Sequence, residues 1–224
     1  MKYLKSDPES VIKTAEALKA KKIVIIPTDT VYGFSGIVSC SGDAHSCVDE
    51  TDAEIRRIKG REAYKPFIQL ISSPEDINLI TDDPLPDELF SLWPGALTII
   101  VNDKRDNTAV DAADGSDEIV VASAGNFAAK PKKTVAVRCP GDAWLREVIR
   151  ETGAPIYSTS VNRSGKPVLT DIADIIEEFG KEVELIIDDG DKRNAVPSTI
   201  VSLVDGKCKV IRQGSVVVPQ SLCK

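Results

Sequence analysis

Short, mainly apolar runs alternate along the chain with longer segments in which apolar residues recur every three or four positions. The run at residues 23–26 is wholly apolar and β-branched, which is typical of a strand buried on both faces. Residues 11–18 carry apolar side chains at helical spacing, and residues 6–9 have the composition of a helix start with a capping box. These patterns predict a helix followed by a buried strand near the beginning of the chain.

The rest of the chain continues this interleaving of helices and strands. Further strands are predicted at residues 67–71, 97–101, 134–138, 156–160 and 185–187, with a terminal hairpin at residues 199–204 and 207–211. Further helices are predicted at residues 54–59, 74–80, 141–152 and 171–179, and one more between Pro86 and Trp93. This order predicts an α/β fold with a twisted, mixed β-sheet flanked by helices, in a single domain over residues 1–224.

Composition and charge narrow the class of protein. The chain has 224 residues, of which 42% are hydrophobic, enough for one domain with a sizeable core. Its net charge of −7 disfavours general binding to nucleic acid, which depends on clustered Lys and Arg. No apolar stretch approaches the roughly 18 residues that span a bilayer, and the N-terminus is polar. We therefore expect a cytoplasmic protein that does not associate with membranes.

The cysteine and histidine content argues against structural cross-links. The chain has five cysteines and one histidine, the cysteines are widely spaced, and no C-x-x-C pair occurs. The sequence therefore predicts reduced thiols, some of them in the core, and no metal ligands.

Candidate chemistry is concentrated where predicted strands end, which is where ligands of α/β sheets bind. The chain has neither a P-loop nor a dinucleotide-binding glycine motif, so any nucleotide would be bound by another device. The segments that combine glycine, proline, hydroxyl and basic residues are 27–33, 59–66, 93–98, 158–165, 197–199 and 212–214.

Two of these features carry a resemblance to a known family. Residues 27–33 read Pro-Thr-Asp-Thr-Val-Tyr-Gly, and Lys59 and Arg61 form a K-x-R element that is followed by an S-x-N element at Ser160 and Asn162. In this order they resemble the YrdC-like family, whose best-known members are threonylcarbamoyl-AMP synthases. The resemblance covers residues 23–214, approximately, and it implies a YrdC-like fold.

The resemblance implies a nucleotidyltransferase that makes L-threonylcarbamoyl-AMP from L-threonine, bicarbonate and ATP and releases pyrophosphate. The product would pass to partner proteins that form N6-threonylcarbamoyladenosine in tRNA. Attack at a phosphoryl centre is catalysed chiefly by positioning and by neutralising charge. Mg²⁺ would be carried mainly by the triphosphate and water, with no protein ligand needed.

By the same matching, individual positions acquire expected roles. Lys59 and Arg61 would be catalytic, and Arg138, which ends a predicted strand, would hold the threonine carboxylate through paired hydrogen bonds. The residues expected around ATP are Arg61, Lys65, Thr134, Ser160, Asn162, Val168 and Arg212. The residues expected around threonine are Thr30, Arg138, Ser158 and Ser198.

Several positions depart from the family pattern. Val161 replaces an alanine, Val168 lacks a common hydroxyl, Lys65 replaces a common asparagine, and Leu70 stands where some members have a histidine. The segments 39–52 and 102–133 are longer than the family leads us to expect. The additional domain of longer members is not expected, since the chain ends soon after residue 214.

Three roles are left open at this stage. Asp29 could be structural or functional, and Tyr32 could belong to the core or to a pocket wall. The basic segment 56–65 keeps an alternative function open, that of a YrdC-like paralogue that binds RNA, weakly, or acts in RNA or ribosome maturation without making the adenylate.

Overall fold

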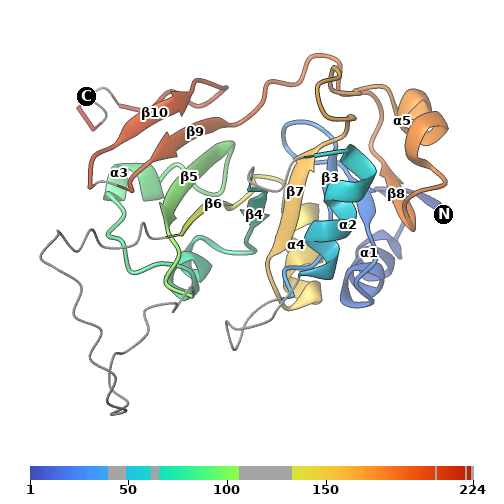
Figure 1. Cartoon of the computed structure of the whole chain (residues 1–224), viewed down its shortest axis with the longest axis horizontal. Helices are drawn as coiled ribbons and strands as arrows, with labels where there is room; N and C mark the ends of the chain where they lie inside the picture. The colour runs from blue at the N-terminus through green and yellow to red at the C-terminus, as the bar shows by residue number, and fades with distance from the viewer. Residues whose placement is uncertain (40–48, 62–65, 106–132, 205, 220, 223–224) are drawn as a thin grey trace, which may run out of the picture.

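The computed structural model of the chain describes residues 1–39, 49–61, 66–105, 133–204, 206–219 and 221–222 (Figure 1). Within them, ten strands form one sheet in the order β1-β8-β2-β3-β7-β4-β6-β5-β9-β10. The strands are β1 (Lys2–Leu4), β2 (Val24–Ile26), β3 (Gly33–Ser35), β4 (Ile68–Leu70), β5 (Leu97–Asn102), β6 (Thr134–Arg138), β7 (Ile156–Ser160), β8 (Leu185–Asp188), β9 (Thr199–Ser202) and β10 (Lys209–Arg212). Parallel and antiparallel pairs both occur, so the predicted mixed α/β fold is confirmed.

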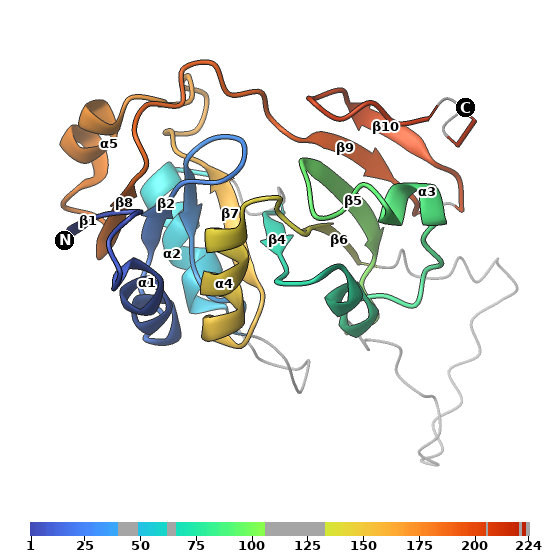
Figure 2. The ribbon, with the colours of Figure 1, turned by 180° about the vertical axis from the view of Figure 1, so that it is seen from behind.

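Helices cover different faces of the two halves of the sheet. The helices are α1 (Ser10–Lys19), α2 (Glu50–Lys59), α3 (Asp87–Phe90), α4 (Ala143–Thr152) and α5 (Ile172–Phe179), with a 3₁₀ turn η1 (Pro74–Leu79). In the first half of the sheet (β1, β8, β2, β3 and β7), α1 and α4 cover one face and α2 and α5 the other, as Figures 1 and 2 show from opposite sides. In the second half (β4, β6, β5, β9 and β10), η1 and α3 pack on one face.

The short apolar run before Pro27 is buried because helices lie on both of its faces. Val24 and Ile26 pack with Leu18 of α1 and Leu145 of α4, whereas Ile25 packs against the α2–α5 side. All three strand residues are fully buried. This explains why the run has no polar alternation.

The second half of the sheet shows alternation where helices cover only one face. Val135 and Val137 of β6 are buried among the α3 and η1 side chains, whereas Thr134 and Ala136 on the other face are partly exposed. Arg138 lies on the same face as Thr134 and Ala136 because side chains two residues apart on a strand point the same way. Among the described residues, no helix packs on this face of β6, which is called the open face below.

The predicted elements agree well with the observed ones, apart from their ends. Residues 134–138 and 156–160 are strands with the predicted bounds, and the terminal hairpin is present as β9 and β10. The capping-box prediction is wrong: α1 has Glu9 as its N-cap without a side-chain bond, and the Asp7 carboxylate accepts instead from the Leu4 amide. The N-terminal strand β1 was not predicted. The predicted long segments 39–52 and 102–133 fall mostly outside the described residues.

The prediction that all thiols are reduced is wrong. Cys208 is disulfide-bonded, whereas Cys139 is free and fully buried. The wide spacing of the cysteines in the sequence gave no sign of this bond, because a disulfide depends on spatial and not sequential proximity.

Within the described part of the chain, no helix is long and apolar enough to cross a membrane. Nor do these residues gather three or more His, Cys, Asp or Glu side chains in an arrangement that could hold a metal ion.

Candidate active site

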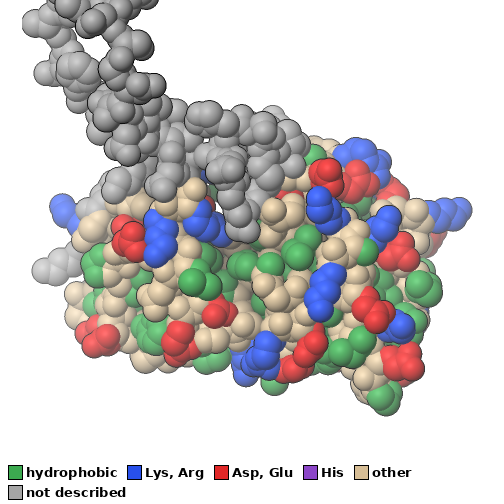
Figure 3. Space-filling model, turned by 90° about the horizontal axis from the view of Figure 1, so that it is seen from below, with side chains coloured by type: hydrophobic (Ala, Val, Ile, Leu, Met, Phe, Trp, Pro, Cys, Tyr) green, Lys and Arg blue, Asp and Glu red, His purple; other side chains and the backbone are tan. Residues whose placement is uncertain are grey.

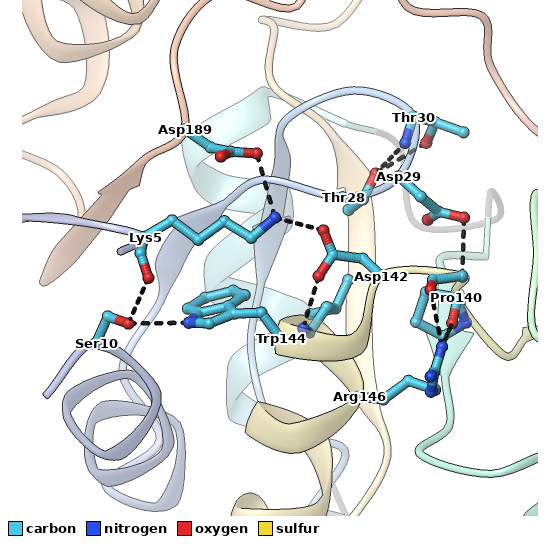
Figure 4. A network of polar contacts seen from close by, with 12 residues as sticks. Lys5, Ser10, Thr28, Asp29, Thr30, Pro140, Asp142, Trp144, Arg146 and Asp189 are labelled. Carbon is cyan, nitrogen blue, oxygen red and sulfur yellow. Dashed lines mark hydrogen bonds and ion pairs between the residues drawn. The ribbon is translucent and has the colours of Figure 1, made fainter. Parts of the chain in front are cut away.

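The loop between β2 and β3 is held in shape by its own hydroxyl groups. The Thr28 hydroxyl donates to the Val31 carbonyl oxygen at 2.8 Å, and its oxygen lies 2.8 Å from the Thr30 hydroxyl and 3.0 Å from the Thr30 amide (Figure 4). Both threonine side chains are buried. The motif at residues 27–33 therefore folds into a tight turn beyond the end of β2, with Thr30 turned toward the open face.

Arg138 connects this loop to the second half of the sheet. Its guanidinium donates to the Thr30 hydroxyl oxygen and the Gly95 carbonyl oxygen, each at 3.1 Å, and forms an ion pair with the Asp29 carboxylate. Asp29 also accepts from the Gly141 amide at 2.9 Å. Arg138 is 4% exposed, so Asp29 compensates a buried charge. Asp29, whose role is open from the sequence, therefore has at least a structural role. Its pairing with Arg138 was not predicted, because 109 residues separate the two.

A second arginine lies beside the first. Arg212 donates to the Ser198 carbonyl oxygen at 2.8 Å and to the Ser198 hydroxyl at 3.2 Å, and that hydroxyl lies 2.9 Å from the Thr98 hydroxyl. Partial burial and the nearby charge of Arg138 lower the pKa of Arg212. Among the described residues, Arg212 has no acidic partner, so an anion bound here would relieve the repulsion between the two guanidinium groups. Thr30, Arg138, Ser198 and Arg212 are called the Arg138 cluster below.

Sheet register explains why residues so far apart in sequence meet. Ile99 pairs with Val137, which sets Thr98 beside Arg138, and both Thr98 and Arg212 pair with Ile200. Paired residues of neighbouring strands point to the same face. Thr98, Arg138 and Arg212 therefore form part of one row across the open face.

Lys59 ends α2 and reaches the turn that follows β7. Its ammonium donates to the Ser160 carbonyl oxygen, to the Asn162 carbonyl oxygen at 3.0 Å and to Asn162 Oδ1 at 2.8 Å. Lys59 is 2% exposed, and no carboxylate among the described residues contacts it. Burial and the nearby charge of Arg61 lower the pKa of Lys59 to about 7. The buried ammonium thus holds the Ser160–Asn162 turn and adds positive charge beside it.

The other predicted residues near this turn lie at its edges. Arg61 donates to the Pro66 carbonyl oxygen at 3.3 Å and lies over the Phe67 ring. The Ser160 hydroxyl donates to Asn162 Oδ1 at 3.0 Å. The geometry brings together Lys59, Arg61, Ser160 and Asn162, called the Lys59 cluster below.

Ser158 and Thr134 lie on the same sheet face as Arg138. Ser158 shares its sheet face with Ala136, because both pair with Ile68, and Thr134 begins the same strand that Arg138 ends. A side chain on Gly33 would begin 2.9 Å from the Ser158 hydroxyl. Glycine is thus required in the motif for close approach of β3 to β7.

The remaining predicted positions are less central. Val168 is 41% exposed in the loop before α5, and Val161 is fully buried in the core beneath the Asn162 turn. Leu70 is buried against α4, and the predicted contact at Lys65 lies outside the described residues. Tyr32 belongs to the core, with its hydroxyl donating to the Gly190 carbonyl oxygen at 2.7 Å.

A cavity of about 530 Å³ opens beside the Thr28–Thr30 loop. Its wall includes Asp142, whose carboxylate receives a hydrogen bond from Lys5 at 2.5 Å (Figure 4). The rest of the wall is the segment 191–195, which leads from β8 toward Ser198. Sequence reasoning did not identify this cavity, because its two walls are far apart in the chain.

Comparison with known proteins identifies the family. The sequence model of the Sua5/YciO/YrdC family, described as "Telomere recombination", matches residues 16–214. The chain is therefore a member of a class of α/β proteins, with the mixed sheet described above. The chain belongs to the Sua5/YciO/YrdC family.

Relatives and solved structures agree with this assignment. The chain is 29% identical to threonylcarbamoyl-AMP synthase of Bacillus subtilis over 96% of its own length and 56% of the relative. It is 30% identical to the synthase of Pyrococcus abyssi, covering 88% of this chain and 52% of that protein. The structure of P. abyssi Sua5 complexed with L-threonine superposes with a TM-score of 0.68 at 27% identity, covering 92% of this chain and 54% of that one. The chain thus spans about half the length of these relatives.

Proposed function

We propose that the chain is a threonylcarbamoyl-AMP synthase, which joins L-threonine, bicarbonate and ATP to give L-threonylcarbamoyl-AMP and pyrophosphate. The observation that carries the proposal is the pairing of the Arg138 cluster with the Lys59 cluster, linked through Ser158 and Thr134 on one sheet face. One cluster suits an amino acid and the other suits phosphate. The relatives named for this activity, and one relative crystallised with threonine, give independent support.

The Arg138 cluster suits the amino acid. Arg138 uses three of its five N–H groups on Asp29, Thr30 and Gly95. The remaining two can donate to a substrate carboxylate, with Arg212 adding charge from β10, across β5 and β9. Thr30, Ser158 and Ser198 supply the hydroxyl groups for the polar atoms of threonine.

The Lys59 cluster suits ATP. Lys59 and Arg61 bring positive charge to the turn that carries Ser160 and Asn162, where charge develops on the α-phosphate as N-carboxythreonine attacks and pyrophosphate leaves. Lys65, Thr134, Val168 and Arg212 complete the proposed ATP contacts. Because the protein offers hydroxyl, amide and cationic groups here, Mg²⁺ would be bound through the triphosphate and water.

The setting of the reaction follows from its product. The mixed anhydride would be passed to partner proteins that modify tRNA, and the cytoplasm is the compartment that we propose. The RNA-binding alternative has less support, because the basic residues Arg56 and Arg57 of α2 are paired with Asp52 and Glu54. On the face seen in Figure 3, basic and acidic side chains are interspersed and form no continuous basic surface.

The test is pyrophosphate release from ATP by the purified chain, with threonine and bicarbonate each omitted in turn. We expect release that requires both. The expected product is L-threonylcarbamoyl-AMP, identified by mass. Release that ignores threonine, or that prefers serine strongly, would overturn the substrate assignment. Salt-dependent RNA binding without any pyrophosphate release would favour the alternative function.

A further inference from the structure

The hydrogen bonds around Thr30 fix the direction in which its hydroxyl points. The Thr28 hydroxyl has one hydrogen, and the carbonyl oxygen of Val31 receives it, since a carbonyl can only accept. Thr28 Oγ1 must therefore accept the bond that joins it to the Thr30 hydroxyl at 2.8 Å. The single hydrogen of the Thr30 hydroxyl is thus used within the loop.

The Thr30 hydroxyl oxygen has one acceptor position left for a ligand. A hydroxyl oxygen has two acceptor positions, and Arg138 Nη1 fills one of them at 3.1 Å. What remains is a single acceptor position on a side chain that is 7% exposed. A ligand that meets Thr30 must present a hydrogen-bond donor.

The hydrogen-bond direction at Ser198 is the opposite of that at Thr30. Thr98 is fully buried, and among the described residues its hydroxyl contacts no polar group other than the Ser198 hydroxyl, at 2.9 Å. A buried hydroxyl hydrogen without an acceptor is costly, so Thr98 donates to Ser198. Arg212 also donates to the same oxygen at 3.2 Å. Both acceptor positions of Ser198 are then filled, and only its hydrogen is free for a ligand.

We propose that Thr28 and Thr98 are positioning residues that set opposite hydrogen-bond directions at two points of the Arg138 cluster. They make Thr30 an acceptor for the substrate amino group and Ser198 a donor to a substrate carboxylate oxygen. The amino group is assigned to Thr30 because Arg138, which holds the carboxylate, contacts Thr30 directly. The α-amino group is one carbon away from that carboxylate. A carbamate N–H in the same position would satisfy Thr30 equally, so the direction is kept when the amine is carboxylated.

This inference rests on the proposed function, because it names the atoms by which the same pocket would hold threonine. The decisive comparison uses L-threonine and 3-hydroxybutanoate, which lacks the amino group. L-2-aminobutanoate, which lacks the hydroxyl, serves as the matched probe. Binding of each is measured by calorimetry on the full chain, and the melting temperature reports whether each variant folds.

In Thr28→Val, the Thr30 hydroxyl loses its acceptor and can turn its hydrogen toward the ligand. The preference for L-threonine over 3-hydroxybutanoate should fall about tenfold, whereas the preference over L-2-aminobutanoate should stay the same. Thr28→Ser keeps the hydroxyl and should keep both preferences. ATP affinity should be unchanged in both variants.

Thr98→Val gives an independent measurement at the other end of the pocket. It frees an acceptor position on Ser198, so the preference for L-threonine over L-threoninamide should fall several-fold, and Thr98→Ser should restore it. An unchanged ratio in both valine variants, with L-threonine still bound, would overturn this inference alone. Failure of the unaltered chain to bind L-threonine would overturn the proposed function as well.

Discussion

Removing the Asp29 carboxylate should leave Arg138 as an uncompensated buried charge. Arg138 is 4% exposed, and Asp29 is its acidic partner among the described residues. Breaking a buried ion pair from one side costs about 3–5 kcal/mol. The lower end applies here, because Asp29 is 19% exposed and because Thr30 and Gly95 still accept from the guanidinium. For a chain of this size, about 3 kcal/mol corresponds to a fall in Tm of roughly 6–12 °C.

The assay is chemical and thermal unfolding of Asp29→Ala, Asp29→Asn and Asp29→Ala/Arg138→Met. Asp29→Asn keeps a hydrogen-bond acceptor but loses the charge, so it separates the two contributions. The double variant removes the buried cation and should be more stable than Asp29→Ala. The reasoning would be refuted if the free energy of unfolding of Asp29→Ala lay within about 1 kcal/mol of that of the unaltered chain. It would also be refuted if the double variant were no more stable than Asp29→Ala.

Lys59 and Gly33 give the remaining predictions. Burial lowers the pKa of Lys59 to about 7, so Lys59 loses part of its charge as pH rises above 7, and a bound triphosphate would restore that charge. ATP binding there at pH 8 should therefore take up protons. Calorimetry in buffers of different ionisation enthalpy measures this uptake, and the same uptake in Lys59→Met would contradict the assignment. In the unfolded chain Lys59 has its ordinary pKa of 10.5, so between about pH 7 and pH 10.5 the unfolded chain binds more protons than the folded one. The free energy of unfolding of the ligand-free protein should therefore increase as pH rises from about 7. Gly33→Ala should displace the Ser158 hydroxyl and raise the Kd for threonine several-fold. The double variant Gly33→Ala/Ser158→Ala should be more stable than Gly33→Ala, because it removes the steric contact between the new methyl group and the Ser158 hydroxyl. Equal stability of the two variants would show that this contact does not exist.

Much of the fold could be predicted because local sequence and tertiary packing agree. The apolar β-branched run at residues 23–26 contains a strand because helices cover both sides of it. The two ends of β6 were predicted correctly, since Thr134 and Arg138 limit an apolar run. In the structure, alternation in β6 places Arg138 on the same face as Thr134 and Ala136.

The details of the site depend on contacts that no local pattern records. Lys59 ends a predicted helix, and nothing near it in the sequence indicates that the Asn162 turn, 103 residues later, buries it. Thr98 ends the candidate segment 93–98, but no local pattern indicates its contact with the Ser198 hydroxyl, 100 residues later. The N-terminal strand β1 was missed because three partly polar residues become a strand only by pairing with β8.

The path of the chain between the halves of the sheet has a mechanical consequence. It passes from one half to the other between α2 and β4, between β6 and α4, and between β8 and β9. Arg61, the Asp29-bound Gly141 and Ser198 lie on these connections. A small rotation of one half of the sheet against the other would therefore change the distance between Lys59 and Arg212. A ligand that contacts both residues would resist such a rotation.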